Sequence, residues 1–208
     1  MDEHFEGFLQ DFSPAIDKRD LPASSIERYR GKLPDQLLTY WQEHGWCGYA
    51  DGVFWTVDPQ DYEPVLAAWI GNTPFMEIDA YHVIARSAFG DLYLFGERHH
   101  QKLHIVAPDA RMLPPRAGIP DSNQSIRAFF SSRSRRACDF SDVTGTQLLY
   151  PAIKKLGRLK YDEMYGFVPA LALGGPATLK HLQTVKAVEH LVLLAQVSEL
   201  GVMAAPSI

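Results

Sequence analysis

Three histidines near the middle of the sequence are of the residue type that binds metal ions. His99 and His100 lie in a polar stretch, 97–102, and His104 lies in the β-rich run that follows it. A hairpin would bring His99 and His104 together, and opposed imidazoles are common zinc ligands. No cysteine or carboxylate completes the set convincingly, so we interpret these histidines as part of a solvated hairpin tip and expect no bound metal.

The sequence patterns of familiar catalytic sites are missing from the chain. It has no Gly-x-Ser-x-Gly elbow, and Gly174-Gly175-Pro176 lacks the following lysine and hydroxyl residue that would hold a nucleotide. Asp58 and Asp61 are explained by helix capping, and Asp162 and Glu163 by an exposed helix or turn. The sequence therefore predicts a protein that is not an enzyme and has no cofactor. A hydrolase whose titratable groups meet only in the folded chain ranks last among the alternatives.

A set of acidic residues in the first half is the more interesting candidate site, one that would contact another protein. These carboxylates flank a predicted helix start, a predicted sheet and a turn; they are Asp58, Asp61, Glu63, Glu77, Asp79 and Asp91. Gathered on one surface, they would occupy positions that phosphates otherwise take on a strongly basic protein such as a nuclease. We therefore predict these six residues as partner contacts. A solvated acidic face has the same sequence signature.

Basic residues concentrate in the second half and suggest an alternative function. Residues 1–105 hold 17 Asp and Glu against 8 Lys and Arg (−9), and residues 106–208 hold 8 against 12 (+4), which sum to the net charge of −5. A nucleic-acid-associated binding module would use the basic side chains Arg133, Arg135, Arg136, Lys154, Lys155, Arg158 and Lys160. The pI near 5.9 and the lack of interleaved aromatic residues disfavour it.

Helices and short strands must position these residues in the first half. An apolar stripe on 5–12 predicts a helix that faces the core, a second helix is predicted after Ser24 or Ser25, and a third between Pro34 and Gly45. Asp51-Gly52 predicts a turn, followed by a strand at 53–57 and a helix that starts at Asp58-Pro59. Short β-rich runs at 81–85, 92–95 and 103–106 predict an antiparallel meander.

The second half follows a proline-rich stretch that lacks apolar periodicity. We predict a linker at 108–122, which divides the chain into a domain at 1–107 and a C-terminal domain at 123–208. Helices are predicted at 125–133, at 146–156 and from Val188 onwards, with an extended segment at 167–173 and a helix or strand around 179–185. The expected fold class is α+β, with N-terminal helices packed on an antiparallel sheet and a smaller, mainly helical C-terminal part.

Composition points to the cytoplasm. The longest aliphatic run, Leu191 to Ala195, is far shorter than the ~20 apolar residues of a membrane span, and the acidic start lacks the basic residues of a signal peptide. Cys47 and Cys138 are far apart and fit neither a disulfide framework nor a zinc pattern. We therefore expect a cytosolic protein that binds no membrane.

Two groups of motifs resemble known families. The first resembles the GAD-like domain family of bacterial proteins and consists of Leu33-Pro34, Leu37, Tyr40-Trp41, Gly45-Trp46, Asp51-Gly52, Phe54-Trp55, Val57-Asp58-Pro59 and Ala88 to Tyr93. The second resembles the C-terminal domain of immunity proteins against type VI secretion DNase toxins and consists of Tyr161 to Leu171, Gly174-Gly175 and His190-Leu191 to Ala195-Gln196. The resemblance implies an immunity protein that binds a cognate DNase toxin 1:1 in the producer's cytoplasm.

Overall fold

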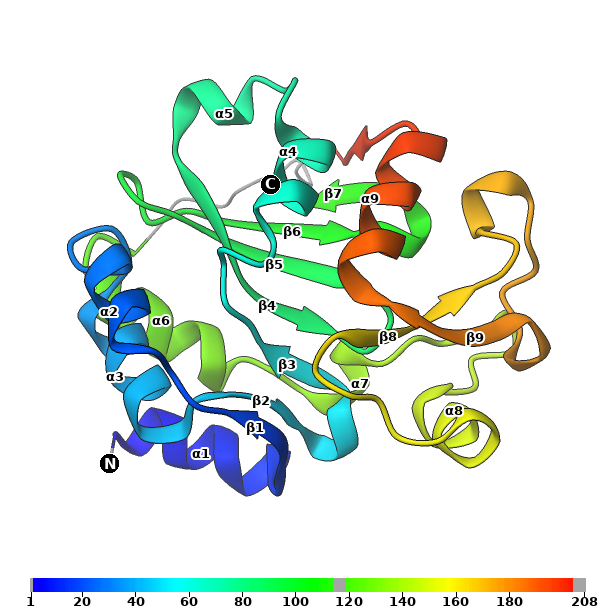
Figure 1. Ribbon diagram of the computed structural model, residues 1–208, viewed down its shortest axis with the longest axis horizontal. Coiled ribbons are helices and arrows are strands. Elements are labelled where there is room, and N and C mark those ends of the chain that lie inside the picture. Colours follow the sequence, from blue (N-terminus) through cyan, green and yellow to red (C-terminus); the bar gives the residue numbers. More distant parts are fainter. Residues whose placement is uncertain (1, 114–118, 204–208) are drawn as a thin grey trace, which may run out of the picture.

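An antiparallel sheet whose strands follow one another in sequence order organises the chain (Figure 1). The computed structural model describes residues 2–113 and 119–203. The order of the eight strands is β1 (Ala15–Arg19), β2 (Trp46–Tyr49), β3 (Phe54–Thr56), β4 (Tyr81–Ser87), β5 (Asp91–Gly96), β6 (Lys102–Val106), β7 (Arg111–Leu113) and β10 (Gly201–Val202). Only β10 is parallel to its neighbour, β7. A separate pair is formed by β8 (Glu163–Phe167) and β9 (Leu182–Lys186).

Helices surround this sheet. They are α1 (Glu3–Phe12), α2 (Ala23–Tyr29), α3 (Asp35–His44), α4 (Glu63–Ile70), α5 (Phe75–Ile78), α6 (Ser122–Ser131), α7 (Arg135–Cys138), α8 (Leu149–Leu156) and α9 (Ala187–Val197). In residues 2–113 and 119–203, four short 3₁₀ turns also form, at Ala50–Gly52, Ala107–Asp109, Leu171–Leu173 and Leu179–His181. Within the described ranges, no helix has the length and apolar character needed to cross a bilayer. The predicted α+β class and the predicted meander are confirmed.

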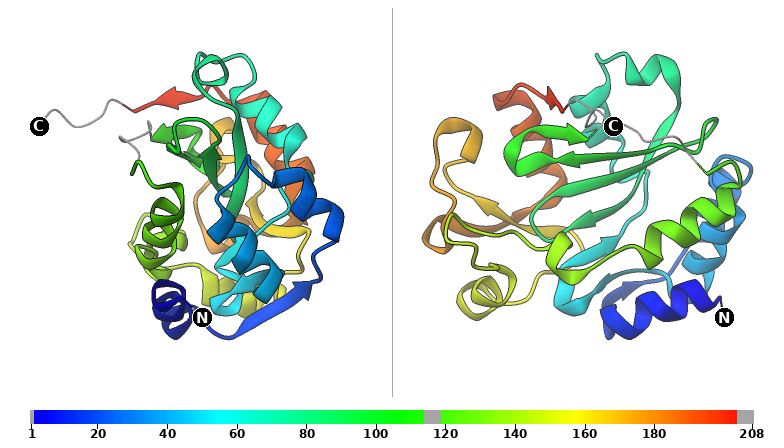
Figure 2. Two further views of the ribbon diagram at one scale, coloured as in Figure 1. Left: turned by 90° about the vertical axis from the view of Figure 1, so that its left-hand side faces the viewer. Right: turned by 180° about the vertical axis from the view of Figure 1, so that it is seen from behind.

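The C-terminal part of the chain contributes a helix to each face of the sheet. In Figures 1 and 2, α4 and α9 lie on one face, and α1 and α6 lie on the other. The Trp69 indole on α4 donates a hydrogen bond to the Leu191 carbonyl on α9, at 3.0 Å. On the opposite face, Phe5 and Phe8 of α1 pack edge-on against Phe130 of α6, with ring centroids 5.0 and 5.2 Å apart. Helices from before and after residue 120 therefore pack together on both faces of the sheet.

Several predicted boundaries hold for the stated reasons. The stripe of α1 faces the core, since Phe5, Phe8 and Phe12 are buried. Pro34 precedes α3, and Gly45 ends it with a φ of 70°, a left-handed conformation that glycine adopts without steric cost. The helix predicted at 125–133 is α6, and the helix predicted from Val188 is α9.

Other boundaries differ from the prediction. The helix expected from Asp58 begins only at Glu63, because residues 58–62 form turns in which Asp58 accepts a hydrogen bond from the Gln60 amide. The second helix begins at Ala23, with Pro22 as its N-cap and no capping serine side chain. The extended segment predicted at 167–173 is a strand only up to Phe167, and a 3₁₀ turn follows at Leu171.

The stretch predicted as a linker contains regular structure at its start. Residues 107–109 form a 3₁₀ turn, and β7 then pairs with β6 in the register Ile105↔Met112. Asp121, at the other end, caps α6 by accepting hydrogen bonds from the Asn123 and Gln124 amides. Residues 114–118 of the predicted linker lie outside the described residues, as do Met1 and residues 204–208 of the two predicted domains. The division into two domains stays a prediction.

Candidate functional site

A buried arginine joins the sheet to the C-terminal part of the chain. Arg86 on β4 is fully buried, and its Nη2 donates to the carbonyl oxygens of Tyr161 (2.7 Å) and Glu163 (2.8 Å). Its Nε donates to the Tyr62 hydroxyl at 2.7 Å, and the guanidinium lies over the Trp55 ring at 5.0 Å. Because a buried cation is costly unless its donors are satisfied, these bonds hold the two parts in a fixed arrangement.

A groove opens beside this junction. It encloses about 330 Å³ and is lined by Arg19, Asp61, Tyr62, Tyr161, Asp162, Lys186, Val188 and Glu189. These residues come from β1, the turns before α4, the segment before β8, the end of β9 and the first turn of α9. The groove is therefore built by segments from both halves of the sequence.

One wall of the groove depends on an irregular edge strand. The register of β1 against β2 shifts between Ile16 and Arg19, and Asp17 within this bulge has a φ of 48°. Asp17 accepts a hydrogen bond from the Tyr161 amide. Arg19 then lies 4.0 Å above the Tyr161 ring and forms an ion pair with Asp61 at 3.1 Å. Bulges on edge strands commonly redirect side chains in this way.

The opposite wall carries the second ion pair of the groove. Lys186, at the end of β9, pairs with Asp162. The pKa of Asp162 is lowered by the hydrogen bond from Lys186, and the pKa of Lys186 is raised by the same bond. Glu189 follows in the first turn of α9 and is exposed. Within the described ranges its carboxylate forms no side-chain hydrogen bond or ion pair, although its charge helps to raise the pKa of Lys186.

Two of the six predicted acidic contacts are buried. Asp79 is fully buried, and its carboxylate accepts hydrogen bonds from the amides of Ala80, Arg98 and His99, each at 2.8 Å. Asp58 is 7% exposed, and burial raises the pKa of its carboxyl group. The Asp58 amide donates to the Tyr161 hydroxyl at 2.9 Å. Both residues therefore stabilise the fold through hydrogen bonds inside the molecule.

The other four predicted contacts lie at different places on the molecule. Asp61 lines the groove, and Glu63 is exposed in the first turn of α4. Glu77 is exposed on α5, and Asp91 starts β5, with its carboxylate 3.8 Å from His104 Nε2. Because Tyr81 pairs with Gly96 and Arg86 with Leu92, the segment containing Glu77 and Asp79 lies at the end of β4 opposite to Asp91, roughly 20 Å away at strand rise. The structure does not bring all six onto one surface.

The three histidines point to different partners. His104 stacks on Tyr93 with centroids 4.7 Å apart, and His100 Nδ1 lies 3.2 Å from the Pro120 carbonyl oxygen. The His99 amide donates to Asp79. In the described part of the chain, no three histidine, cysteine, aspartate or glutamate side chains are grouped so that they could hold a metal ion.

Most of the basic set of the second half is used inside the molecule. Arg133 lies over Phe129 and Tyr93, and Arg158 pairs with Asp51 at 2.7 Å. Lys155 donates to the carbonyl oxygens of Leu179, Lys180 and Leu182. Arg135 donates to the Asp11 carbonyl oxygen. Four of the seven basic side chains thus stabilise the fold. Fewer basic side chains are therefore left to contact the phosphates of a nucleic acid.

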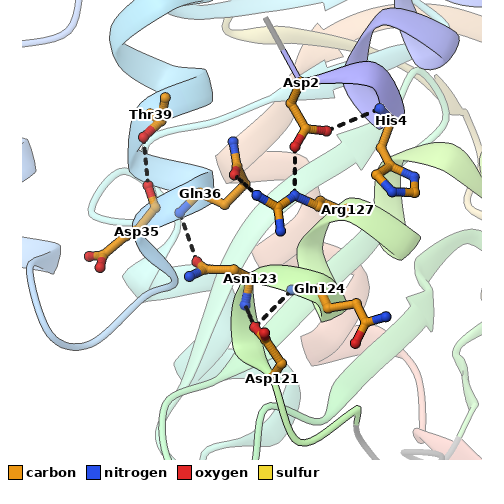
Figure 3. A network of polar contacts seen from close by, with 9 residues as sticks. All are labelled: Asp2, His4, Asp35, Gln36, Thr39, Asp121, Asn123, Gln124 and Arg127. Atoms are coloured by element: carbon orange, nitrogen blue, oxygen red, sulfur yellow. Dashed lines mark hydrogen bonds and ion pairs between the residues drawn. The ribbon is translucent and has the colours of Figure 1, made fainter.

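A second polar network fixes α6 against the N-terminal helices (Figure 3). Arg127 on α6 donates to the Asp2 carboxylate at 2.6 Å and to the Gln36 side chain at 2.5 Å. The Asn123 side chain accepts a hydrogen bond from the Gln36 amide at 2.9 Å. The pKa of Asp2 is lowered because the hydrogen bonds and charge of Arg127 outweigh its partial burial. This network and the Arg86 junction hold opposite faces of the sheet.

Apart from Asp61, the groove residues were not predicted as a site from the sequence. Arg19, Tyr161, Lys186 and Glu189 are separated by up to 170 positions, and their meeting depends on the β1 bulge and on the Arg86 junction. One sequence signal was available: Arg86 is the only charged residue in the run Val83 to Phe89. A lone charge in a buried strand indicates a satisfied internal partner.

Each half of the chain matches the model of a known protein family. The family model of the GAD-like domain matches residues 3–109, and the family model "T6SS immunity protein Tdi1, C-terminal" matches residues 123–198. Both resemblances inferred from the sequence are thus confirmed.

The fold also occurs in a solved structure. "Crystal structure of Atu4351 from Agrobacterium tumefaciens" superposes with a TM-score of 0.82 at 22% sequence identity, covering 92% of this chain and 88% of that chain. At this identity the likeness establishes the shared fold. No curated protein matches the chain.

Proposed function

This chain belongs to the GAD-like domain family, and we propose that it is an immunity protein that binds and inhibits a cognate DNase toxin of a type VI secretion system in the cytoplasm of the cell that makes both. The observation that carries this proposal is the match of residues 123–198 to the C-terminal region of the type VI secretion immunity protein Tdi1. The regions matched by the two family models, residues 3–109 and 123–198, pack against each other, as expected for a protein that uses both.

The geometry suits a protein that binds as a rigid body. A partner surface that is already ordered loses little conformational entropy on binding, so more of the contact energy appears as affinity. Here the Arg86 junction and the Arg127 network fix the C-terminal part on both faces of the sheet. We expect the bound and free backbones to be nearly the same.

Protection sets a requirement on affinity. A toxin present at nanomolar concentration must be held by an inhibitor with a Kd at or below about 1 nM, which corresponds to roughly −12 kcal/mol. A 1:1 interface of the usual size, about 1,600 Å² in total, reaches such affinity when a few well-packed residues dominate it. Inhibition then follows if the interface covers the active site or the DNA-binding surface of the toxin.

The proposal predicts a DNase toxin gene beside the gene of this chain, and the test is co-expression of the two proteins. We expect the cells to survive, the two proteins to co-purify as a 1:1 complex, and the complex to have lost DNA cleavage. The control is the same toxin with an inactivated catalytic site, which should still form the complex. Cell death with no complex would refute the proposal. A shift of DNA or RNA by the full chain alone, at 50 mM salt, would instead support the nucleic-acid alternative.

A further inference from the structure

We propose that the groove between β1 and the start of α9 binds a basic segment of the toxin and places a lysine or arginine side chain of that segment against Glu189. This inference rests on the proposed function and assigns a contact site to it. The occupant is identified by its chemistry: a flexible cation that is presented by a peptide backbone.

The groove volume of about 330 Å³ is at the lower end of the ~300–1,000 Å³ range of sites that enclose small ligands. A long side chain with its adjoining peptide group fits such a space, whereas a folded element such as a helix does not. The groove therefore suits an inserted side chain at the centre of a larger interface.

The groove has a net negative charge. Its residues carry three carboxylates, on Asp61, Asp162 and Glu189, against two cations, on Arg19 and Lys186, which gives −3 + 2 = −1. Arg19 is paired with Asp61 and Lys186 with Asp162, whereas Glu189 acts on Lys186 only through its charge and has no ion pair of its own in the described part of the chain. A cation entering the groove gains a partner without displacing an existing ion pair, and an anion meets net repulsion.

Two buried tyrosines keep this part of the groove rigid. Tyr62 and Tyr161 line the groove, and their hydroxyl groups are held from inside the molecule, the first by a hydrogen bond from Arg86 Nε and the second by one from the Asp58 amide. Because these side chains are already ordered, an inserted side chain does not have to order them when it binds.

A protein that cleaves DNA must neutralise phosphates with lysine and arginine side chains, so its substrate-binding surface is basic. Binding of one of those side chains in the groove would remove it from DNA contact. The groove therefore offers a route to inhibition that requires no contact with the toxin's catalytic residues.

The experiment measures the Kd of a catalytically inactive toxin for full-length variants of this chain by calorimetry. Glu189→Lys reverses the unpaired charge, and Glu6→Lys is the matched control. Glu6 is likewise an exposed glutamate in the first turn of a helix, so both changes have the same effect on helix stability. We expect Glu189→Lys to weaken binding at least about 10-fold and Glu189→Gln to weaken it less, with Glu6→Lys within about 2-fold of the parent chain.

Two outcomes would overturn the inference while leaving the proposed function intact. One is a Glu189→Lys variant that binds within about 2-fold of the parent chain, and the other is an equal loss for Glu189→Lys and Glu6→Lys, which would indicate a general charge effect. Thermal unfolding of each variant shows that a loss of binding is not a loss of folding. If the parent chain itself binds no toxin, the proposed function fails, and the groove assignment fails with it.

Discussion

The guanidinium of Arg86 donates to the backbone carbonyl of Tyr161 at 2.7 Å across 75 positions of sequence. The side chain has no carboxylate partner among the described residues; its donors are taken up by three carbonyl oxygens and one hydroxyl group. Such an arrangement stabilises one geometry of the junction, because any shift of the segment Tyr161–Glu163 leaves a buried charge with fewer acceptors.

Removal of the Arg86 side chain should therefore destabilise the whole protein. For Arg86→Ala we expect a loss of about 3–5 kcal/mol in the free energy of unfolding, because three backbone carbonyl groups and the Tyr62 hydroxyl lose their donor. Arg86→Lys keeps the charge but not the fork of donors, and should lie in between. Urea denaturation followed by circular dichroism measures both. An Arg86→Ala chain as stable as the parent would show that the junction contributes nothing.

The turn that follows β4 contains a glycine, Gly90, whose replacement should also destabilise the protein. Gly90 has a φ of 98°, and a Cβ placed there would lie 2.6 Å from the Met164 methyl group on β8. Gly90→Ala should cost about 1–3 kcal/mol through backbone strain and overpacking. Gly7→Ala is the control: it is an open position within α1, where alanine should stabilise by up to about 1 kcal/mol. The shift in denaturation midpoint should have opposite signs in the two variants.

Elements with a strong local signal could be predicted from the sequence. The helix between Pro34 and Gly45 and the three strands of the β4–β6 meander depend on caps, turns and residue preferences within a few positions. The edge strands β1 and β10 could not be predicted, because four of the five residues of β1 and both of β10 are exposed and show no alternating apolar pattern. Their pairing with β2 and β7 is decided by tertiary contacts.

The candidate site was predictable only in its general character. The sequence indicates an acidic first half, but it does not show that Asp79 is buried with three amide donors or that Lys186 neutralises Asp162. Whether a charged side chain is free or paired depends on residues far away in sequence. The free carboxylate of the groove, Glu189, lies in the half with net positive charge. The net charge of one half of the sequence therefore does not predict the charge of a groove that is built from both halves.

The buried carboxyl group of Asp139 should give the protein a pH-dependent stability. Burial raises the pKa of Asp139 to about 6, against the opposing effect of hydrogen bonds from the Phe140 and Leu149 amides. A carboxyl group whose pKa is higher in the folded state contributes most stability below its unfolded pKa, near 4, and loses it as the pH rises through about 6. Because of Asp139, the free energy of unfolding should be roughly 1–2 kcal/mol lower at pH 7 than at pH 4.

Asp139→Asn isolates this contribution. The amide oxygen can still accept both backbone hydrogen bonds, and the side chain no longer ionises. We expect the variant to be more stable than the parent chain at pH 7 and equal to it or less stable at pH 4. Urea midpoints at pH 4, 5, 6 and 7 provide the measurement. A difference between the two proteins that stays constant over this range would contradict the assignment.

The buried and exposed members of the predicted acidic set should respond differently to substitution. Asp79→Ala removes a buried carboxylate that accepts hydrogen bonds from three backbone amides and should cost about 2–4 kcal/mol of stability. Glu77→Lys, two positions away on the exposed side of α5, should leave the unfolding free energy within about 0.5 kcal/mol.

Exposed carboxylates act on a basic partner mainly through the rate of encounter. If Glu63 and Glu77 steer the toxin, Glu63→Lys and Glu77→Lys should each slow association several-fold at low salt, and the difference from the parent chain should shrink as salt is raised to 0.5 M because the Debye length falls to a few ångströms. Dissociation should change little. Stopped-flow or surface-binding kinetics at two salt concentrations would measure both rates, and identical association rates for the parent and variant chains at low salt would show that the acidic half does not guide the partner.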